Sequence, residues 1–309
     1  MRKVVSPVKI VLDNNASLTE SPPVGCREEW IRVDGLKIRC WRAGAGPQLV
    51  LLHGLLGYSF SWRCAIPILA AQFEVFAPDL PGAGFSELSC HLDCRLSAAA
   101  ERLRGFLDAS GIESCALVGS SYGGATAVMF AATAPSRIRH LALVSPANPW
   151  SRIGRIRLAL LRHRMIASLF PPIARGMRFL NPYFVRRMYG DASRISSETL
   201  RGYARPLARP GIFEHAVKIA GAWRADMREF QAALPRIRSI PTLLIWGSED
   251  RVVDLASAAL LEQSLPNSQL RVMDGVGHLP YEESPGEFCQ VLTQFFYATA
   301  PDTLQREVT

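Results

Sequence analysis

The sequence predicts an α/β fold, with a mostly parallel twisted sheet of about eight strands, helices on both faces and an inserted helical cap. Three observations predict it. Short apolar runs alternate with helical patterns along much of the 309 residues, which indicates parallel strands joined by helices. Asp34-Gly35 stands between two strand-like runs, a strong hairpin signal. An apolar strand also passes through a Gly-x-Ser-x-Gly turn into a small-residue helix.

The elements follow in order along the chain. Residues 29–33 and 36–41 alternate in polarity around Asp34-Gly35, and we expect them to be antiparallel edge strands. The later strands and helices are predicted from buried apolar runs and from helical spacing. The strands are 48–52, 74–77, 115–118, 138–144, 241–246 and 269–273, and the helices are 62–71, 97–109, 122–132, 256–264 and 285–297.

Between residues 146 and 235 the alternation stops, and prolines divide a helical pattern at Pro171-Pro172, Pro182, Pro206 and Pro210. We interpret this segment as a helical cap over the loops that follow the parallel strands. The predicted organisation is a flexible leader at 1–27, an α/β core made of 28–145 and 236–298, the cap at 146–235, and a C-terminal tail at 299–309.

Ser121 is the candidate nucleophile. A serine on a sharp strand-to-helix turn needs glycines two positions before and after it, because a Cβ there would collide with neighbouring backbone. Gly119 and Gly123 satisfy that spacing. With Ser120 at the centre, Val118 and Tyr122 would occupy the flanking positions, so Ser120 is the neighbour.

The context of the turn supplies the other parts of a catalytic site. The strand 48–52 ends in His53-Gly54-Leu55-Leu56-Gly57, a loop of the kind that supplies an oxyanion-hole amide. Asp250 follows the strand 241–246 and is the candidate orienting carboxylate, with Glu249 and Asp254 as nearby rivals. His278 stands in a glycine-rich loop after the strand 269–273 and is the candidate base.

These residue types suit nucleophilic catalysis. A serine hydroxyl is a weak nucleophile at neutral pH, so His278 would accept its proton and Asp250 would hold the imidazole in the useful tautomer. The backbone amides of Leu55 and Tyr122 would bind the negative oxygen that develops on the attacked carbonyl.

In these motifs the chain resembles the α/β-hydrolase superfamily over residues 28–298, with Ser121, Asp250 and His278 in the Ser…Asp…His order. The stretches 78–86 and 278–285 are also family-like, whereas Asp254 departs from a Val-Pro continuation found in many relatives. The resemblance does not specify a reaction. Haloalkane dehalogenases and most epoxide hydrolases of the superfamily use aspartate at the turn, and Ser121 argues against both.

The predicted function is cleavage of an ester or related acyl bond of a hydrophobic substrate through an acyl-enzyme. A carbon–carbon hydrolase or an acyltransferase with the same triad remains the enzymatic alternative, and a non-catalytic ligand-binding homologue is the alternative of another class. The residues expected to contact substrate are His53, Gly54, Leu56, Ser120, Trp223 and Leu279. Those expected to line an apolar pocket, or to form the cap's own core, are Leu158, Leu161, Met165, Phe170, Phe179, Tyr183, Phe184 and Trp223.

Composition limits cofactors and location. No Gly-x-Gly-x-x-Gly follows a strand and no phosphate loop is present, so the sequence implies no cofactor. Cys90-His91-Leu92-Asp93-Cys94 has zinc-ligand residue types but no second half elsewhere, so we expect a surface loop and no metal. Seven scattered cysteines and the absence of an 18-residue apolar window or a signal-like N-terminus predict a cytoplasmic protein with reduced thiols.

The charge of the chain is concentrated in the predicted cap. Residues 151–209 hold thirteen arginines and no lysine against Asp191 and Glu198, a net charge of +11, while the whole chain carries +8. Arginines interleaved with apolar residues, as in 153–170, suit an interfacial helix, so peripheral contact with an anionic membrane is one hypothesis. An arginine-rich solvent face over a pocket lining is the other. No nucleic-acid module accompanies the charge, and the oligomeric state stays open.

Overall fold

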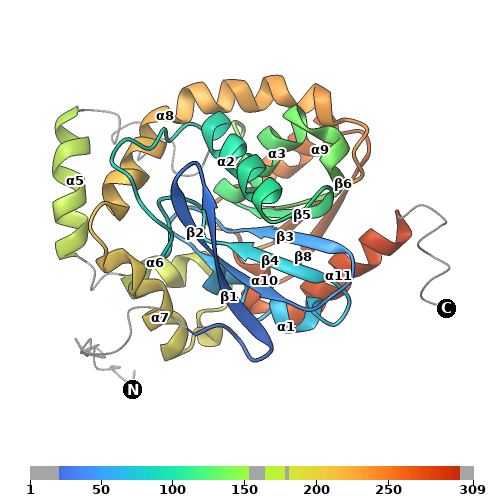
Figure 1. The fold of residues 1–309 in the computed structure, drawn as a ribbon, viewed down its shortest axis with the longest axis horizontal. Helices are drawn as coiled ribbons and strands as arrows, with labels where there is room; N and C mark the ends of the chain where they lie inside the picture. The colour runs from blue at the N-terminus through green and yellow to red at the C-terminus, as the bar shows by residue number, and fades with distance from the viewer. Residues whose placement is uncertain (1–20, 153–163, 178–180, 300–309) are drawn as a thin grey trace, which may run out of the picture.

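A computed structural model of the chain describes residues 21–152, 164–177 and 181–299. Within these residues eight strands form one sheet in the order β1-β2-β4-β3-β5-β6-β7-β8, and helices cover both of its faces (Figure 1). The predicted α/β class and the mostly parallel sheet are confirmed. The strands are β1 (Cys26–Val33), β2 (Leu36–Ala43), β3 (Gln48–Leu52), β4 (Glu74–Pro78), β5 (Cys115–Ser120), β6 (Ile138–Val144), β7 (Thr242–Gly247) and β8 (Ser268–Met273).

The sheet is parallel from β4 to β8 and antiparallel at its β1 end. Asp34 and Gly35 both have positive φ and join β1 to β2 in the predicted hairpin, with Val33 paired to Leu36. The prediction of two edge strands is wrong for β2, because its second side pairs with β4. Alternating polarity indicates which side chains lie on each face of the sheet. It does not indicate whether a second strand pairs along the strand's other edge.

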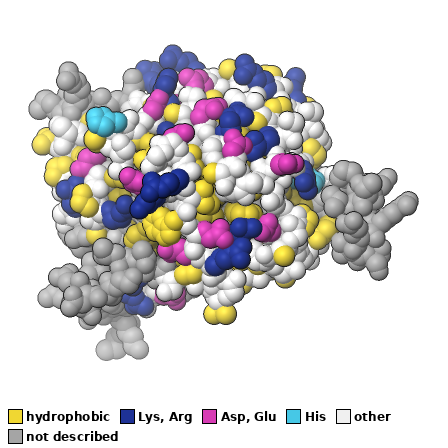
Figure 2. All heavy atoms as spheres, viewed as in Figure 1, with side chains coloured by type: hydrophobic (Ala, Val, Ile, Leu, Met, Phe, Trp, Pro, Cys, Tyr) yellow, Lys and Arg dark blue, Asp and Glu magenta, His cyan; other side chains and the backbone are white. Residues whose placement is uncertain are grey.

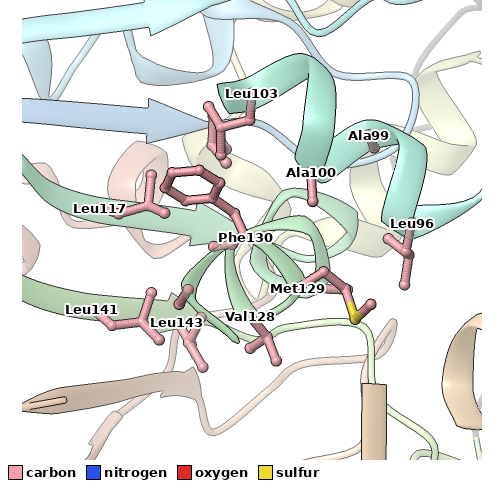
Figure 3. Close-up of a cluster of buried hydrophobic side chains, with 14 of the residues drawn as sticks. Leu96, Ala99, Ala100, Leu103, Leu117, Val128, Met129, Phe130, Leu141 and Leu143 are labelled. Carbon is pink, nitrogen blue, oxygen red and sulfur yellow. The ribbon is translucent and has the colours of Figure 1, made fainter. Parts of the chain in front are cut away.

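Two hydrophobic clusters fill the two faces of the sheet. One joins α2 (Leu96–Ala109), α3 (Tyr122–Thr133) and α9 (Ala256–Ser264) to the sheet, and Figure 3 shows Phe130 of α3 between Leu103 of α2 and Leu117 of β5. The other gathers α1 (Ile66–Leu69), α10 (Pro280–Glu283) and α11 (Pro285–Ala298) around aromatic rings such as Trp62 and Phe288. Burial of each such ring stabilises the fold by about 1.5–3 kcal/mol.

The segment between β6 and β7, residues 145–241, is here called the insertion. Its described helices are α5 (Arg164–Gly176), α6 (Asn181–Met188), α7 (Ser197–Ala204) and α8 (Ile212–Ala233), with short 3-10 turns η4 (Ala192–Arg194), η5 (Pro206–Ala208) and η6 (Leu234–Ile237). Pro182, Pro206 and Pro210 lie at or just before element starts, where proline is tolerated. The predicted break at Pro171-Pro172 is wrong, because α5 continues through both prolines.

Other boundaries differ by small amounts. The chain enters β1 at Cys26, inside the predicted leader 1–27, of which residues 1–20 lie outside the described part, as do 300–309 of the predicted tail. The helix predicted over 62–71 is only a 3-10 turn, η1 (Ser59–Trp62), followed by the four-residue α1. In the described ranges, no helix is both long enough and apolar enough to cross a bilayer.

A buried ion pair organises the loop that follows β4. Arg39 of β2 and Asp79, just after β4, are both completely buried, with 3.5 Å between Arg39 Nη1 and Asp79 Oδ2. Asp79 also accepts the backbone N–H groups of Ser59 at 2.7 Å and Phe85 at 2.8 Å. A single carboxylate therefore fixes the start of η1 and the loop of residues 80–85.

We expect Asp79→Asn to lower the free energy of unfolding by about 1–3 kcal/mol. The variant leaves Glu28 as the carboxylate partner of the buried Arg39 guanidinium, and its amide can place an NH₂ group against the N–H donors of Ser59 and Phe85. Urea unfolding followed by circular dichroism measures the change. Asp108→Asn is the matched control, since its ion pair with Arg137 is exposed and such pairs contribute about 0–1 kcal/mol. Equal destabilisation by the two variants would contradict the assignment.

Candidate active site

Ser121 occupies the turn between β5 and α3 in a strained conformation, with φ 52° and ψ −116°. Its N–H donates to the Val144 carbonyl at 3.0 Å, and its carbonyl accepts the Ala147 N–H at 2.9 Å. Both neighbours belong to the β6 edge, so backbone hydrogen bonds hold the strained residue in place. A non-glycine residue at positive φ costs about 1–3 kcal/mol and persists only where its surroundings enforce it.

The two glycines of the motif allow this turn for the reason expected from the sequence. A Cβ on Gly119 would lie 2.5 Å from the Gly123 carbonyl oxygen, and a Cβ on Gly123 would lie 2.5 Å from the carbonyl oxygens of Leu52 and His53. Each contact is with backbone, which cannot rotate away. β5, α3 and the end of β3 therefore approach one another at a distance that only glycine permits.

The loop after β3 lies directly against Ser121. A Cβ on Gly54 would be 3.1 Å from Ser121 Cβ and 3.7 Å from Ser121 Oγ. Leu55 is the exposed next residue and Leu56 has a positive φ of 61°. Tyr122 is the first residue of α3, where N–H groups have no acceptor inside the helix. The two amides predicted for the oxyanion hole thus flank the Gly54–Ser121 contact in sequence.

His53 is a buried support of this loop. Its Nε2 accepts the Leu80 N–H at 2.8 Å, so the proton resides on Nδ1 and is donated to the Gly54 carbonyl at 2.8 Å. Burial lowers the pKa of His53, and the Asp79 carboxylate and the Gly54 carbonyl oppose this only in part. A neutral His53 therefore orients Gly54 from within the protein.

Asp250 and His278 form the pair predicted from the sequence. His278 Nδ1 lies 2.8 Å from Asp250 Oδ2, and both side chains are buried. The other carboxylate oxygen of Asp250 accepts the N–H groups of Val252 at 2.7 Å and Val253 at 2.9 Å. Burial raises the pKa of Asp250, but the His278 ring and these amides outweigh it, so the net pKa lies below the ordinary value.

The ends of three parallel strands bring the predicted residues to one edge of the sheet. Ser121 follows β5, Asp250 follows β7 and the His278 loop follows β8, with β6 between β5 and β7. Among the described residues, no hydrogen bond joins Ser121 Oγ to His278. Hydrogen bonds of this kind are often long in unliganded enzymes and tighten when substrate binds.

Two of the residues predicted to contact substrate, Ser120 next to Ser121 and Leu279 next to His278, are buried. Ser120 is fully buried, with its hydroxyl 3.1 Å from the Tyr281 hydroxyl. Leu279 is also buried and belongs to the hydrophobic cluster that includes Tyr281. Their contact with substrate stays a prediction.

The His278 loop is tied to the insertion. The His278 N–H donates to the Met188 carbonyl of α6 at 2.6 Å. Glu283 accepts the Gly277 N–H at 2.7 Å through one oxygen, and through the other it accepts the N–H groups of Gly190 at 2.9 Å and Asp191 at 3.2 Å. One carboxylate thus joins the loop that carries His278 to the chain that leaves α6. Burial raises the pKa of Glu283, although these hydrogen bonds oppose it.

Glu282 makes a second buried connection between core and insertion. Its carboxylate accepts the Tyr189 hydroxyl at 2.6 Å, is 2.8 Å from Arg63 Nη1 and also accepts the Tyr203 hydroxyl. Tyr203 Oη lies 3.0 Å from Ser61 Oγ. Ser61 and Arg63 follow the Gly54 loop, which lies against Ser121. The insertion is therefore bonded both to the segment after the Gly54 loop and to the loop that carries His278.

A small cavity lies beside the Gly54 loop. Its volume is about 20 Å³, room for about one water molecule. The core lines one side and the insertion the other. The described lining residues are His53, Gly54, Leu55, Leu56, Leu80, Pro81, Gly82, Ala83, Gly84, Tyr122, Pro206, Ile212, His215, Ala216 and Ile219.

His215 of α8 is the titratable insertion residue in this lining. Its Nδ1 lies 3.3 Å from Cys94 Sγ, whose thiol also reaches the Leu92 carbonyl at 3.3 Å. Burial, helped by the charges of Arg102 and Lys218, lowers the pKa of His215 to about 4. Burial likewise raises the pKa of the Cys94 thiol. The two groups therefore face each other neutral.

The residues predicted to line a pocket in the cap do not lie together in one place. Trp223 lies on α8 and packs against the cluster of α2 and α3. Tyr183 and Phe184 on α6 and Phe170 on α5 are exposed. Leu158, Leu161 and Phe179 lie outside the described residues, and the side chain of Met165 is not described either.

The cysteine-rich loop 90–94 holds no recognisable metal centre. Cys90 is exposed and Cys94 is buried against His215. Across the described part of the chain, no group of three or more His, Cys, Asp or Glu residues could hold a metal ion.

Sequence reasoning missed Glu283, Glu282 and His215. The first two stand five and four residues after His278, in the family-like stretch 278–285. Two carboxylates just after a glycine-rich loop and before a helix were the available signal. His215 gives no local signal, because its position in the cavity depends on how α8 lies over the core.

Comparisons with known proteins agree with this architecture. A family model described as the alpha/beta hydrolase fold matches residues 47–285. A pimeloyl-[acyl-carrier protein] methyl ester esterase of Aeromonas hydrophila is 29% identical to this chain, over 82% of this chain and 97% of the relative. A 2-hydroxy-6-oxo-2,4-heptadienoate hydrolase of Pseudomonas putida is 28% identical over 85% and 94%. The solved structure of Cfl2 from Burkholderia cenocepacia superposes with a TM-score of 0.80 at 23% identity, over 90% and 98%.

We expect Glu283→Gln to weaken the site, because an amide NH₂ would face backbone N–H donors on one side of the side chain. The expected cost is about 1–3 kcal/mol of stability, together with a lower kcat at an unchanged KM as the His278 loop loosens. Glu287→Gln, at an exposed position on α11, is the control and should leave both unchanged. Thermal unfolding and steady-state kinetics at several pH values measure the outcome. A variant that loses stability but keeps kcat would show that Glu283 has no positioning role.

His215 should make stability depend on pH. An unfolded histidine titrates near 6.5 and folded His215 near 4, so the unfolded chain binds more protons between these values. Stability therefore falls as pH drops from about 6.5 to 4, by about 3 kcal/mol in all. The difference in unfolding free energy between wild type and His215→Gln isolates this change, because Asp226, whose pKa burial raises to about 6, is common to both. A difference that does not vary with pH would refute it.

Proposed function

Because this chain belongs to the α/β hydrolase family, we propose that it is a serine hydrolase that cleaves carboxylic ester or related acyl bonds of a hydrophobic substrate through an acyl-enzyme intermediate. The observation that carries the proposal is the strained Ser121 on its glycine turn, at the same sheet edge as the hydrogen-bonded Asp250–His278 pair. Membership of the family and its named hydrolases make the chain an enzyme of the hydrolase type.

In the proposed reaction Ser121 Oγ attacks the substrate carbonyl and passes its proton to His278 Nε2. Asp250 keeps the proton of the His278 ring on Nδ1 and stabilises the imidazolium that forms. His278 then protonates the leaving alcohol, and a water molecule attacks the acyl-enzyme with His278 as base. The buried carboxylate with its lowered pKa stays ionised throughout, as this role requires.

The developing oxyanion would be bound by the N–H groups of Leu55 and Tyr122. Support for this assignment comes from the Gly54 loop, which touches Ser121, and from the neutral His53 that orients the Gly54 carbonyl. The loss of one such donor typically costs about 3–4 kcal/mol of barrier.

We propose that the insertion acts as a cap, and that the cavity between it and the core is where the substrate enters. The cavity is too small for an acyl chain, so substrate binding requires Pro206, Ile212 and the neighbouring residues of α8 to move away from the core loops. The mostly apolar lining favours a hydrophobic substrate. All seven cysteines are free, which supports a reducing compartment such as the cytoplasm.

A carbon–carbon hydrolase is the second candidate, supported by the likeness to the heptadienoate hydrolase, which has a similar identity to that of the methyl ester esterase. An acyltransferase would use the same three residues with an alcohol in place of water. A ligand-binding protein without turnover would need none of the three together.

The test is Ser121→Ala. We expect a loss of kcat of roughly 10⁶-fold, as in other serine triads, with the fold retained, measured on aryl esters of graded chain length. A fluorophosphonate should label wild type and Ser120→Ala but not Ser121→Ala, which separates the two adjacent hydroxyls. Undiminished ester turnover by Ser121→Ala would refute the nucleophile, and absence of any adduct on folded wild type would favour the ligand-binding protein. Turnover of a vinylogous diketone without ester hydrolysis would favour the carbon–carbon hydrolase.

A further inference from the structure

The helix α5 carries an apolar stripe that faces solvent. Leu169 is 57% exposed and Ile173 is 53% exposed, and three further apolar residues on α5 and just after it are also exposed. All five recur at helical spacing and so share one face. They are Ile166, Leu169, Phe170, Ile173 and Met177.

Packing on the opposite side of α5 fixes this orientation. Pro171 is buried, and Ala174 packs against the cluster formed by Leu207, Ile212 and Phe213. Arg175 forms an ion pair with Glu214 of α8, with 2.6 Å between Nη2 and Oε1. An amphipathic helix of a globular protein ordinarily turns its apolar stripe toward the core, and α5 does the reverse.

The next described helix along the chain, α6, also exposes apolar side chains. Tyr183 and Phe184 are both exposed, with their rings 5.6 Å apart in an edge-to-face arrangement. In Figure 2 hydrophobic side chains lie at the left edge of the molecule, where Figure 1 places α5, with Lys and Arg atoms close by. The exposed apolar side chains of α5 and α6, here called the α5–α6 face, therefore come from two consecutive described helices of the insertion.

The charge of the insertion accompanies this apolar face. Arg186 and Arg187 end α6, and the whole stretch 151–209 has thirteen arginines against two acidic residues. Basic residues near an anionic lipid surface each contribute about 1 kcal/mol to binding, and apolar side chains that enter the interface add to this. The two features together are the two signals that stable peripheral binding requires.

We propose that the α5–α6 face docks the protein on an anionic phospholipid membrane. A second copy of the chain fits this face less well, because a two-fold contact would bring two arginine-rich surfaces together. Anionic lipid offers both the opposite charge and an apolar layer for the stripe.

Docking through this face would bring the cavity close to the lipid. α5 packs on α8, and Ile212 and His215 of α8 line the cavity. A hydrophobic substrate could then pass from the bilayer to the cavity with little exposure to water. This consequence rests on the proposed function, whereas the docking itself does not.

The experiment is co-sedimentation of the full chain with phosphatidylcholine vesicles, with and without phosphatidylglycerol, at low and high salt. We expect binding to be about tenfold stronger with phosphatidylglycerol at low salt and to weaken at high salt. The double variant Leu169→Glu/Ile173→Glu should lose binding by about tenfold or more. Arg186→Gln/Arg187→Gln should lose about tenfold on anionic vesicles only.

Leu260→Glu is the matched control, because Leu260 is an exposed leucine on α9, outside the insertion, and is 42% exposed. It should bind like wild type. Circular dichroism and thermal unfolding check that each variant keeps its fold. Ser121→Ala should bind vesicles like wild type, which separates docking from catalysis. Equal binding to neutral and anionic vesicles, or full binding by the Leu169/Ile173 variant, would overturn the proposal. If the Leu169→Glu/Ile173→Glu variant changed its oligomeric state but bound vesicles like wild type, the proposal would also be overturned, and the face would be assigned to self-association.

Discussion

The close approach of three backbone segments around Ser121 is the constraint on which the rest of the site depends. β5, α3 and the loop after β3 meet where Gly119, Gly123 and Gly54 have no side chains. Because a Cβ on Gly119 or Gly123 would overlap backbone atoms, only glycine permits this approach. Ser121 has positive φ at this point, α3 begins immediately after it, and the Gly54 loop lies against its side chain. The strain is maintained by hydrogen bonds from the β6 edge, in a sheet where β5 is fully buried and β6 is buried except at Arg139.

The histidine of the site depends on the insertion as well as on the core. Asp250 orients the imidazole directly. The backbone around His278 is held by the Met188 carbonyl and by Glu283, which accepts N–H groups from both the His278 loop and the insertion. Glu282 adds a buried polar cluster with Arg63 and two tyrosines. Such networks are stable only when each member is satisfied. A displacement of α6 or of the chain after it would therefore reach the proposed base.

The insertion has two surfaces with different characters. Its inner surface, through η5 and α8, closes a small and mostly apolar cavity over the Gly54 loop. Its outer surface presents apolar side chains of α5 and α6 among arginines. Because α5 is anchored on α8 by Ala174 and Arg175, the two surfaces are mechanically connected. This connection links a mostly apolar cavity to the α5–α6 face that we propose contacts lipid.

The sequence by itself determined the α/β class, the hairpin at Asp34-Gly35 and the turn at Ser121, because each depends on residues close together in the chain. It also singled out Asp250 and His278, since parallel strands place their following loops at one edge. Tertiary structure alone decided that β2 is interior, that α5 continues through Pro171 and Pro172, and that its apolar stripe faces outward. Those features, like the hydrogen bonds of Glu283 to Gly190 and Gly277, arise from contacts between distant segments. Local spacing records which residues share a face, but only packing determines what that face meets.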